Sequence, residues 1–223
     1  MTLQARAQIT RQSIIDAAAE VFTELGYGTA SLTEMIDRAG VTKGAFHYHF
    51  PTKESIALAL VDYADCAIAD VLEAELRPTP LPALECLVRA AFVVADLARA
   101  DARVAIGIHL WDSLGHPDTL PANRIRRQEL AMEAIDRAVR EGDVSADVDP
   151  EDVCHTLWVG MLGNQLHARA GSSDGGDDAV ATLSVVLRII LRGICTERSA
   201  PFFAHFVERL GRQYAAIRAD PVS

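Results

Sequence analysis

The sequence predicts an all-α protein, and three observations support this fold class. Apolar residues recur at intervals of three and four along most of the 223 residues, which is the period of an amphipathic helix. Clusters of Gly, Pro, Asp and Ser separate these segments. No segment alternates between apolar and polar residues as a half-buried strand does. We expect a small three-helix domain at the N-terminus, followed by a larger helical bundle.

Composition excludes several classes of protein. Half of the residues are apolar, which is ample for a core, yet no run of about 18 uncharged apolar residues occurs, so no membrane span is expected. The N-terminus has no hydrophobic segment of a signal peptide, and a cytoplasmic location is therefore expected. The four cysteines are far apart without a C-x-x-C spacing, which favours buried thiols over a zinc or redox site.

Local signals define the first two helices. Thr10 is expected to cap the first helix, and Gly26 to stop it. Ser31 and Glu34 have the spacing of a capping box and open a second, short helix that Gly40 breaks. The apolar side of the first helix comprises Ile14, Ile15, Ala18, Val21, Phe22 and Leu25. The apolar side of the second comprises Leu32, Met35, Ile36 and Ala39.

A third helix follows a tight glycine turn and has an unusual outer face. Thr42 is a credible N-cap, and Pro51 ends the helix. The side chains expected to face inward are Val41, Ala45 and Phe50. Those left outward are Thr42, Lys43, His47 and Tyr48. Two short helices joined in this way form a helix-turn-helix, and hydroxyl, basic and aromatic groups on its outer face suit a polyanion such as DNA.

The distribution of charge supports DNA binding by this region alone. Residues 1–53 carry as many basic as acidic side chains, so all of the net charge of −10 lies in the rest of the chain. Both lysines, Lys43 and Lys53, lie in the first part. A region without net charge can approach DNA, whereas the acidic remainder of the chain is repelled by it. We therefore expect a DNA-binding domain at 1–53 and a ligand-binding and dimerisation domain at 54–223.

The remaining helices are predicted from the same clusters of Gly, Pro, Asp and Ser that separate the apolar segments. Thr52 is expected to cap a long helix that runs to about Arg77, where a Pro-rich segment ends it. Further helices are expected at 83–99, 102–113, 120–141, 150–170, 178–196 and 200–218.

The helix at 178–196 is apolar at nearly every angular position, so it is expected to be buried on all sides. One interpretation is a central helix within a monomer. The interpretation that we favour is a two-fold homodimer interface shared with 200–218. Its expected residues are Val180, Leu183, Leu187, Ile190, Leu191, Phe203 and Phe206.

No arrangement of residues predicts catalysis, a metal or a cofactor. Gly26-Tyr27-Gly28 lacks the preceding strand and third glycine of a dinucleotide site. Cys154 and His155 are adjacent on a helix and point about 100° apart. His47 and His49 also diverge, with no third ligand nearby. We therefore expect a protein that is not an enzyme.

Residues 14–60 closely resemble the DNA-binding domain of the TetR family of bacterial repressors, through AAAEVFTELGY, SLTEMI and AGVTKGAFHYHFPTKESIALAL. Weaker similarity, in GVTKGAFHYHF and DVDPEDVCHTL, is to the γ-butyrolactone-type autoregulator receptors of actinomycetes. The resemblance implies a repressor that binds a palindromic operator on double-stranded DNA as a homodimer and is released by a small-molecule effector. The alternative is an all-α small-molecule carrier or enzyme with an incidental helix-turn-helix.

The resemblance implies DNA contacts by position. Thr42 and Lys43 would meet a phosphate at the positive end of the recognition helix. Gly44 would allow close approach to DNA, and Ala45 would touch a thymine methyl group. The other implied contacts are Thr33, His47, Tyr48, His49 and Lys53.

The resemblance also implies an effector pocket in the larger domain. Its candidate residues are Phe92, His109, Trp111, Arg127, Met132, Trp158, Met161 and Gln165. For each of them, a place in the packed core is the alternative. Butyrolactone receptors have a tryptophan early in the helix expected at 120–141, where this chain has Arg124-Ile125-Arg126-Arg127. The effector is therefore either butyrolactone- or butenolide-like, or an anion that meets Arg126 or Arg127.

Overall fold

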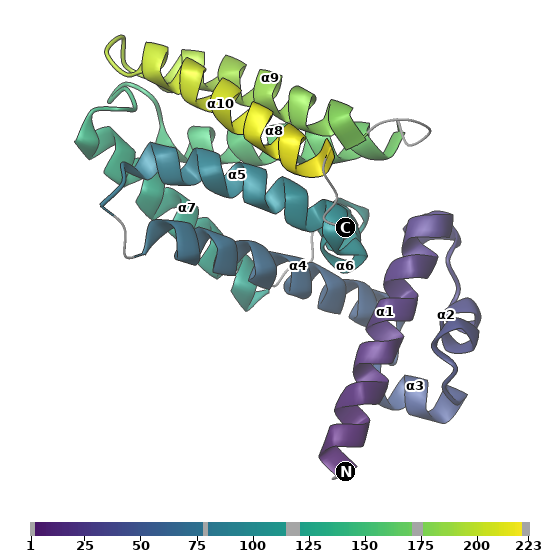
Figure 1. Cartoon of the computed structure of the whole chain (residues 1–223). Helices are drawn as coiled ribbons and strands as arrows, with labels where there is room; N and C mark the ends of the chain where they lie inside the picture. Colours follow the sequence, from purple (N-terminus) through teal and green to yellow (C-terminus); the bar gives the residue numbers. More distant parts are fainter. Residues whose placement is uncertain (1–2, 78–79, 115–120, 171–175, 220–223) are drawn as a thin grey trace. The chain divides into compact units, whose positions relative to one another are not determined.

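The computed structural model describes residues 3–77, 80–114, 121–170 and 176–219, which form ten helices and no strand (Figure 1). The predicted all-α fold class is confirmed. The helices are α1 (Leu3–Thr29), α2 (Leu32–Ala39), α3 (Lys43–His49), α4 (Lys53–Leu76), α5 (Ala83–Ala100), α6 (Ala102–Ser113), α7 (Ala122–Glu141), α8 (Pro150–Ala170), α9 (Gly176–Ile194) and α10 (Ala200–Ala219). Among these residues, no helix is long and apolar enough to cross a membrane.

The predicted start of α1 was wrong, whereas its predicted break was right. The helix begins at Leu3, and Thr10 lies inside it, where its hydroxyl donates to the carbonyl oxygen of Arg6 at 3.0 Å. A threonine hydroxyl that bonds back to residue i−4 is satisfied within a helix, so it does not signal a helix start. Gly26 has a φ of 76° and interrupts the helical path.

The capping signals around the turn are confirmed. The Ser31 hydroxyl accepts from the Glu34 amide, and the Glu34 carboxylate accepts from the Ser31 amide at 2.8 Å. Gly40 closes α2 with a left-handed φ of 63°, which favours glycine. The Thr42 hydroxyl accepts from the Ala45 amide at 3.2 Å and opens α3.

The helices form two compact units that do not follow the order of the chain. Unit 1 is built from residues within 1–67 and 98–125, and unit 2 from residues within 68–97 and 126–223. Helix α6 therefore packs with the helix-turn-helix in unit 1, although the chain reaches it only after α5. This division into units does not test the functional boundary expected at residue 53, which stays a prediction.

The core of unit 1 joins α1 to α4 with α6. Phe46 of α3 and Phe50, the C-cap of that helix, are both buried in it. Val41 and Ala45, which were expected to face inward, are only half-buried, so Phe46 is the anchor that the sequence interpretation missed. Other buried members of this core are Ile14, Phe22, Met35, Ile56, Leu60, Ile106, Leu110 and Trp111.

Helix α6 lies unusually close to α4 at Gly107. A Cβ atom at this position would lie 2.3 Å from the Leu60 carbonyl oxygen and 2.7 Å from the Ala64 Cβ. The start of α6 is held by Asp101, whose carboxylate accepts from the Arg103 amide and guanidinium and from the Tyr63 hydroxyl. The Arg103 hydrogen bond is the main cause that lowers the pKa of Asp101 to about 2, so its stabilising charge persists until the pH falls well below 4.

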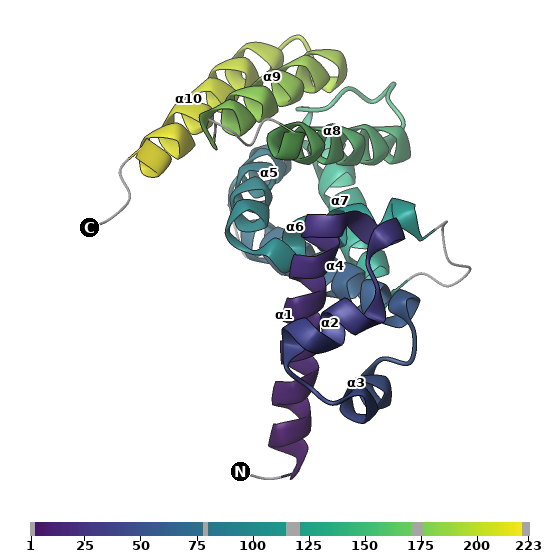
Figure 2. The same ribbon diagram turned by 90° about the vertical axis from the view of Figure 1, so that its right-hand side faces the viewer.

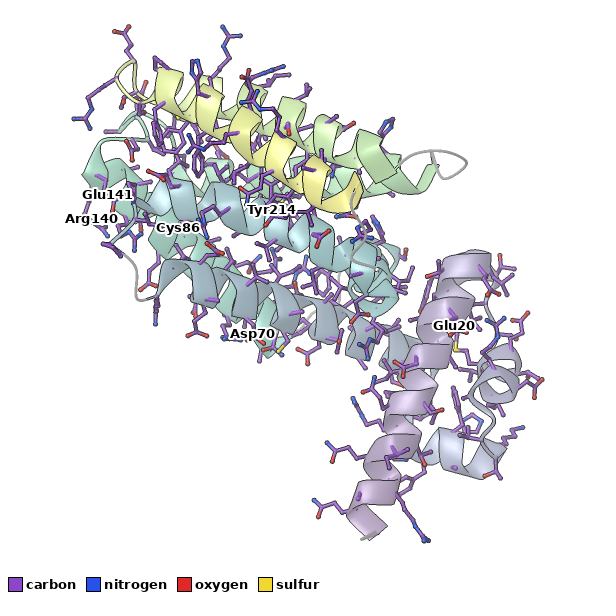
Figure 3. The ribbon with its side chains drawn as sticks, in the orientation of Figure 1. Glu20, Asp70, Cys86, Arg140, Glu141 and Tyr214 are labelled. Carbon is purple, nitrogen blue, oxygen red and sulfur yellow. The ribbon has the colours of Figure 1, made fainter. Side chains whose placement is uncertain are left out.

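Unit 2 is a bundle in which α9 and α10 lie side by side (Figures 1 and 2). Tyr214, on the side of α10 that faces α5, stacks on Phe92 with 5.3 Å between ring centroids (Figure 3). Gly160 of α8 allows a close approach to α9, because a Cβ there would lie 2.9 Å from a methyl carbon of Val186.

The residues expected at the dimer interface lie instead within the core of a single chain. Val180, Leu183, Leu187, Leu191, Phe203 and Phe206 are buried there, and Ile190 packs against them. Leucine, valine and phenylalanine at helical spacing mark the most buried face of a helix, and here that face belongs to a core that also contains buried residues of α5, α7 and α8 of the same chain. The exposed apolar side chains of α9 and α10 are Val185, Ile189, Phe202 and Ile217.

We predict that Gly107→Ala lowers the free energy of unfolding by about 1–3 kcal/mol, because the added methyl group overlaps a backbone oxygen that cannot rotate away. Urea denaturation followed by circular dichroism measures the change. The control is Gly193→Ala, since nothing lies within 4 Å of a Cβ at this helical position. Equal stability of the two variants would contradict the close packing of α6 on α4.

Candidate DNA-binding surface and effector cavity

The outer face of α3 is exposed and chemically suited to DNA. Phe46 and Phe50 are buried in the core of unit 1 and anchor one side of α3. Lys43 and His47 are exposed on its other side. Tyr48 is 81% exposed, which is unusual for a large aromatic side chain with no role in the core. These three residues place a cation, an imidazole and a phenol on one short helix.

The other residues expected to contact DNA are mostly accessible. Thr33, Thr42 and Gly44 are exposed, while Ala45 and His49 are half-buried. The ring of His49 lies edge-on to that of Tyr48, with 5.1 Å between centroids. This contact orients the exposed tyrosine.

Lys53 has a structural role that the sequence did not reveal. Its ammonium group donates to the carbonyl oxygens of Tyr27, Gly28 and Ala30 at 2.7, 3.2 and 3.1 Å. It also lies 4.7 Å from the centroid of the Tyr27 ring. A lysine has three N–H donors, so these bonds occupy them all. Lys53 ties the α1–α2 connection to α4, and a phosphate would have to displace one of these carbonyls.

Arg11 of α1 is a candidate DNA contact that sequence reasoning missed. Its guanidinium carbon lies 5.2 Å from the centroid of the Phe50 ring, so this cation is held beside the end of α3. Arg38, by contrast, pairs with Glu20 and Glu24 at 3.0 and 2.8 Å, and these carboxylates offset its charge. Figure 3 shows Glu20 on α1, beside α2. The pattern of the sequence did not distinguish these two arginines.

Unit 2 contains a cavity of about 80 Å³. Three of the predicted pocket residues line it, namely Arg127, Trp158 and Met161. The other described lining residues are Ile68, Leu72, Leu84, Leu87, Val88, Ala90, Ala91, Val94, Ala131, Ile135, Cys154, Leu157, Leu187 and Leu191. Among the residues that the structure describes, the lining is therefore almost entirely apolar, with one charged side chain.

The other five predicted pocket residues do not line this cavity. Phe92 is buried against Tyr214, and Met132 and Gln165 are half-buried elsewhere on their helices. His109 and Trp111 belong to α6 and therefore to unit 1. From the sequence alone, the aliphatic residues that line the cavity cannot be distinguished from residues of the packed core.

The arginines of Arg124-Ile125-Arg126-Arg127 have three different environments. Arg127 lies 3.8 Å from the centroid of the Trp158 ring. Arg124, one turn earlier on α7, lies 3.9 Å from that of Trp111 and forms a buried ion pair with Asp65 at 3.2 Å. Arg126 faces outward and pairs with Asp70 and Glu73 of α4.

Residues 14–60 match the bacterial regulatory proteins of the tetR family. The chain is 34% identical over 198 residues to the A-factor receptor protein of Streptomyces griseus, which covers 87% of this chain and 67% of the relative. It is 36% identical over 179 residues to the HTH-type transcriptional repressor BepR of Brucella suis biovar 1, covering 75% and 86%.

Solved structures with a similar fold support the same family assignment. A crystal structure of a gamma-butyrolactone receptor (ArpA-like protein) covers 93% of this chain and 99% of its own, at 28% identity and a TM-score of 0.76. CprB from Streptomyces coelicolor, in complex with its biological operator sequence, covers 93% and 99%, at 29% identity and a TM-score of 0.74.

The fold and the exposed face of α3 define a helix-turn-helix transcriptional regulator. The chain belongs to the TetR family, and both resemblances seen in the sequence, to that family and to its autoregulator receptors, are confirmed. It is a ligand-responsive DNA-binding repressor, and the alternative of a carrier or enzyme with an incidental helix-turn-helix is not favoured.

We predict that Lys53→Met lowers the free energy of unfolding by about 1–3 kcal/mol, because three carbonyl oxygens lose a charged donor. Lys43→Ala removes a cation from the exposed face of α3 and should change stability by no more than about 0.5 kcal/mol. Thermal and urea unfolding of both variants provide the comparison. If Lys53→Met were as stable as the unchanged protein, the role of Lys53 in holding the α1–α2 connection would be refuted.

Proposed function

We propose that this repressor binds a palindromic operator as a homodimer and leaves it when a small molecule enters the cavity of unit 2. The observation that carries the proposal is the outer face of α3, where Lys43, His47 and Tyr48 are exposed around a buried phenylalanine anchor. An operator is chromosomal, so the protein would act in the cytoplasm.

The recognition helix is expected to enter the major groove. Its N-terminus carries the positive end of the helix dipole together with Lys43, and both favour a phosphate. Tyr48 and His47 then reach base edges or the backbone, while Gly44, with open space around it, permits close approach. Because the rest of the chain is acidic, contacts outside this region would weaken binding rather than support it.

The dimer is expected to form through the exposed apolar side chains of unit 2. Val185 and Ile189 lie four residues apart on α9, and Ile189 is 64% exposed. Val159 and Leu166 of α8 and Phe202 of α10 are also exposed. Several large apolar side chains left in water on neighbouring helices are typical of a protein interface. A two-fold axis through this face would give the operator its palindromic symmetry.

The cavity is smaller than the ligand expected to bind in it, so ligand binding is expected to move the helices that line it and thereby release the protein from DNA. Its volume of about 80 Å³ is below the ~300–1,000 Å³ typical of sites for drug-sized ligands. A ligand of that size must separate the lining helices, two of which, α4 and α7, also contribute residues to unit 1. Ligand binding would then favour a conformer whose recognition helices no longer match successive major grooves, about 34–36 Å apart.

Because relatives are receptors for A-factor and for gamma-butyrolactone, we include a butyrolactone- or butenolide-like molecule among the candidate effectors. To move the protein from mostly bound to mostly free, the effector must prefer the released conformer by about 5 kcal/mol.

A DNase I footprint tests the proposal. At low salt, the protein should protect a palindromic site in a promoter, with that of its own gene the first to examine. Lys43→Ala and Tyr48→Ala should each abolish or greatly weaken this protection, because they alter the exposed face of α3 without touching its core. Absence of any protected sequence, or unchanged protection by both variants, would refute the proposal.

We predict that Ile189→Glu converts the dimer into a monomer, because two-fold pairing would bury a carboxylate in each copy. Sedimentation equilibrium measures the change in mass, and operator affinity should fall with it. Ile9→Glu is the matched control, since Ile9 is 58% exposed but lies on α1 in unit 1. A monomeric control, or a dimeric Ile189→Glu, would be inconsistent with this interface.

A further inference from the structure

The inner side of α1 changes its chemistry before the helix reaches its N-terminus. Within the core of unit 1, this side presents Ile14 and Ile15, which are buried. At about 100° per residue, the same side of the helix continues through Arg11, Gln8 and Gln4, which are all exposed. Figures 1 and 2 show that the N-terminal turns of α1 extend past α3. The side of α1 that is apolar inside the core is therefore cationic and polar where the core ends.

Arg11 is held at the end of the recognition helix. Its guanidinium carbon lies 5.2 Å from the centroid of the ring of Phe50, the C-cap of α3. Lys43 is the first residue of the same helix. Seven residues at 1.5 Å each make α3 about 10 Å long, so the two cations lie near its opposite ends. The major groove is about 12 Å wide, and a helix of this length inside it can reach the phosphates on both of its sides.

The positive charge of Arg11 is not offset by the protein. Residues 1–15 contain no Asp or Glu. In the part of the chain that the structure describes, Arg11 and Lys43 form no ion pair, whereas other arginines of unit 1 do. These other pairs are Arg38 with Glu20 and Glu24, Arg103 with Asp101, and Arg124 with Asp65. An exposed, uncompensated arginine beside the recognition helix of an acidic protein suits contact with a polyanion.

We infer that the N-terminal part of α1 is a second DNA-contacting element, in which Arg11 binds a backbone phosphate on the side of the major groove opposite the phosphate that Lys43 binds. This inference rests on the proposed function, in which α3 enters the groove. Gln8 and Gln4 share the same side of α1, and their amide groups can donate to further backbone oxygens. Contacts to phosphates carry no sequence information, so Arg11 sets the affinity and orientation of α3 rather than the sequence that α3 reads.

A phosphate contact has a measurable signature. Each phosphate that a protein neutralises adds about −0.9 to the slope of the logarithm of the binding constant against the logarithm of salt concentration. Because a dimer carries two copies of Arg11, Arg11→Gln should flatten this slope by about 2 and weaken binding at low salt at least about 10-fold. Loss of a purely structural contact would not change the slope, because it neutralises no phosphate.

Fluorescence anisotropy of the full-length protein tests the inference, with a labelled duplex of about 30 base pairs and arbitrary sequence at about 20 to 150 mM KCl. An arbitrary sequence is sufficient, because phosphate contacts form on any duplex. Arg6→Gln is the matched control. Arg6 is also exposed on α1 and carries the same charge, but it lies about 140° around the helix from Arg11. This variant should keep the slope of the unchanged protein.

Arg11→Lys separates the charge of the side chain from its shape. Lysine keeps the positive charge but lacks the guanidinium fork, so this variant should keep the slope and bind somewhat more weakly. Circular dichroism checks that each variant is folded. Hydrogen–deuterium exchange of the unchanged protein needs no variant, and there the duplex should slow exchange at residues 4–11.

Several results would overturn the inference. They are an unchanged slope in a folded Arg11→Gln, an equal flattening in Arg6→Gln, a flattened slope in Arg11→Lys, and unaltered exchange at residues 4–11. Absence of binding to the duplex at low salt would overturn it as well.

The footprint separates this inference from the proposed function. If an operator is protected and Arg11→Gln keeps the slope of the unchanged protein, only the inference fails. If no sequence is protected, the proposed function fails, whereas binding to the arbitrary duplex still reports whether Arg11 contacts a phosphate.

Discussion

The close approach of α6 to α4 at Gly107 is the constraint on which the DNA-binding unit depends. Only a residue without a side chain allows the backbone of α6 to lie against the Leu60 carbonyl oxygen. The contact brings Ile106, Leu110 and Trp111 into the core that also holds α1, Phe46 of α3 and Phe50 at its C-cap. The exposed face of α3 is therefore positioned by a helix from a later part of the chain.

Local structure could be predicted from the sequence, because its signals are local. The Ser31–Glu34 capping box, the left-handed Gly40 and the Thr42 cap each involve residues within a few positions of one another. The place of α6 could not be predicted in this way. In the sequence, Gly107 is a glycine of low helix propensity within a helical segment. Nothing in the neighbouring sequence shows that the backbone of a second helix lies against it.

The candidate sites show the limit of helical periodicity. An apolar period identifies the buried side of a helix, but it does not tell whether that side meets its own core, a cavity or a second molecule. Trp158 and Met161 do line the cavity, whereas Phe92, with the same apolar character, packs on Tyr214. Likewise, Leu187 fills the core of unit 2 and Ile189, two residues later, is left in water.

An acidic protein is expected to meet DNA through the outer face of α3. Hydrogen–deuterium exchange of the full-length protein, with and without operator DNA, tests this most directly. We expect DNA to slow exchange in α2 and α3, above all at residues 43–49, and to leave exchange in α8 to α10 unchanged. Protection centred on α8 to α10, with none at 43–49, would contradict it.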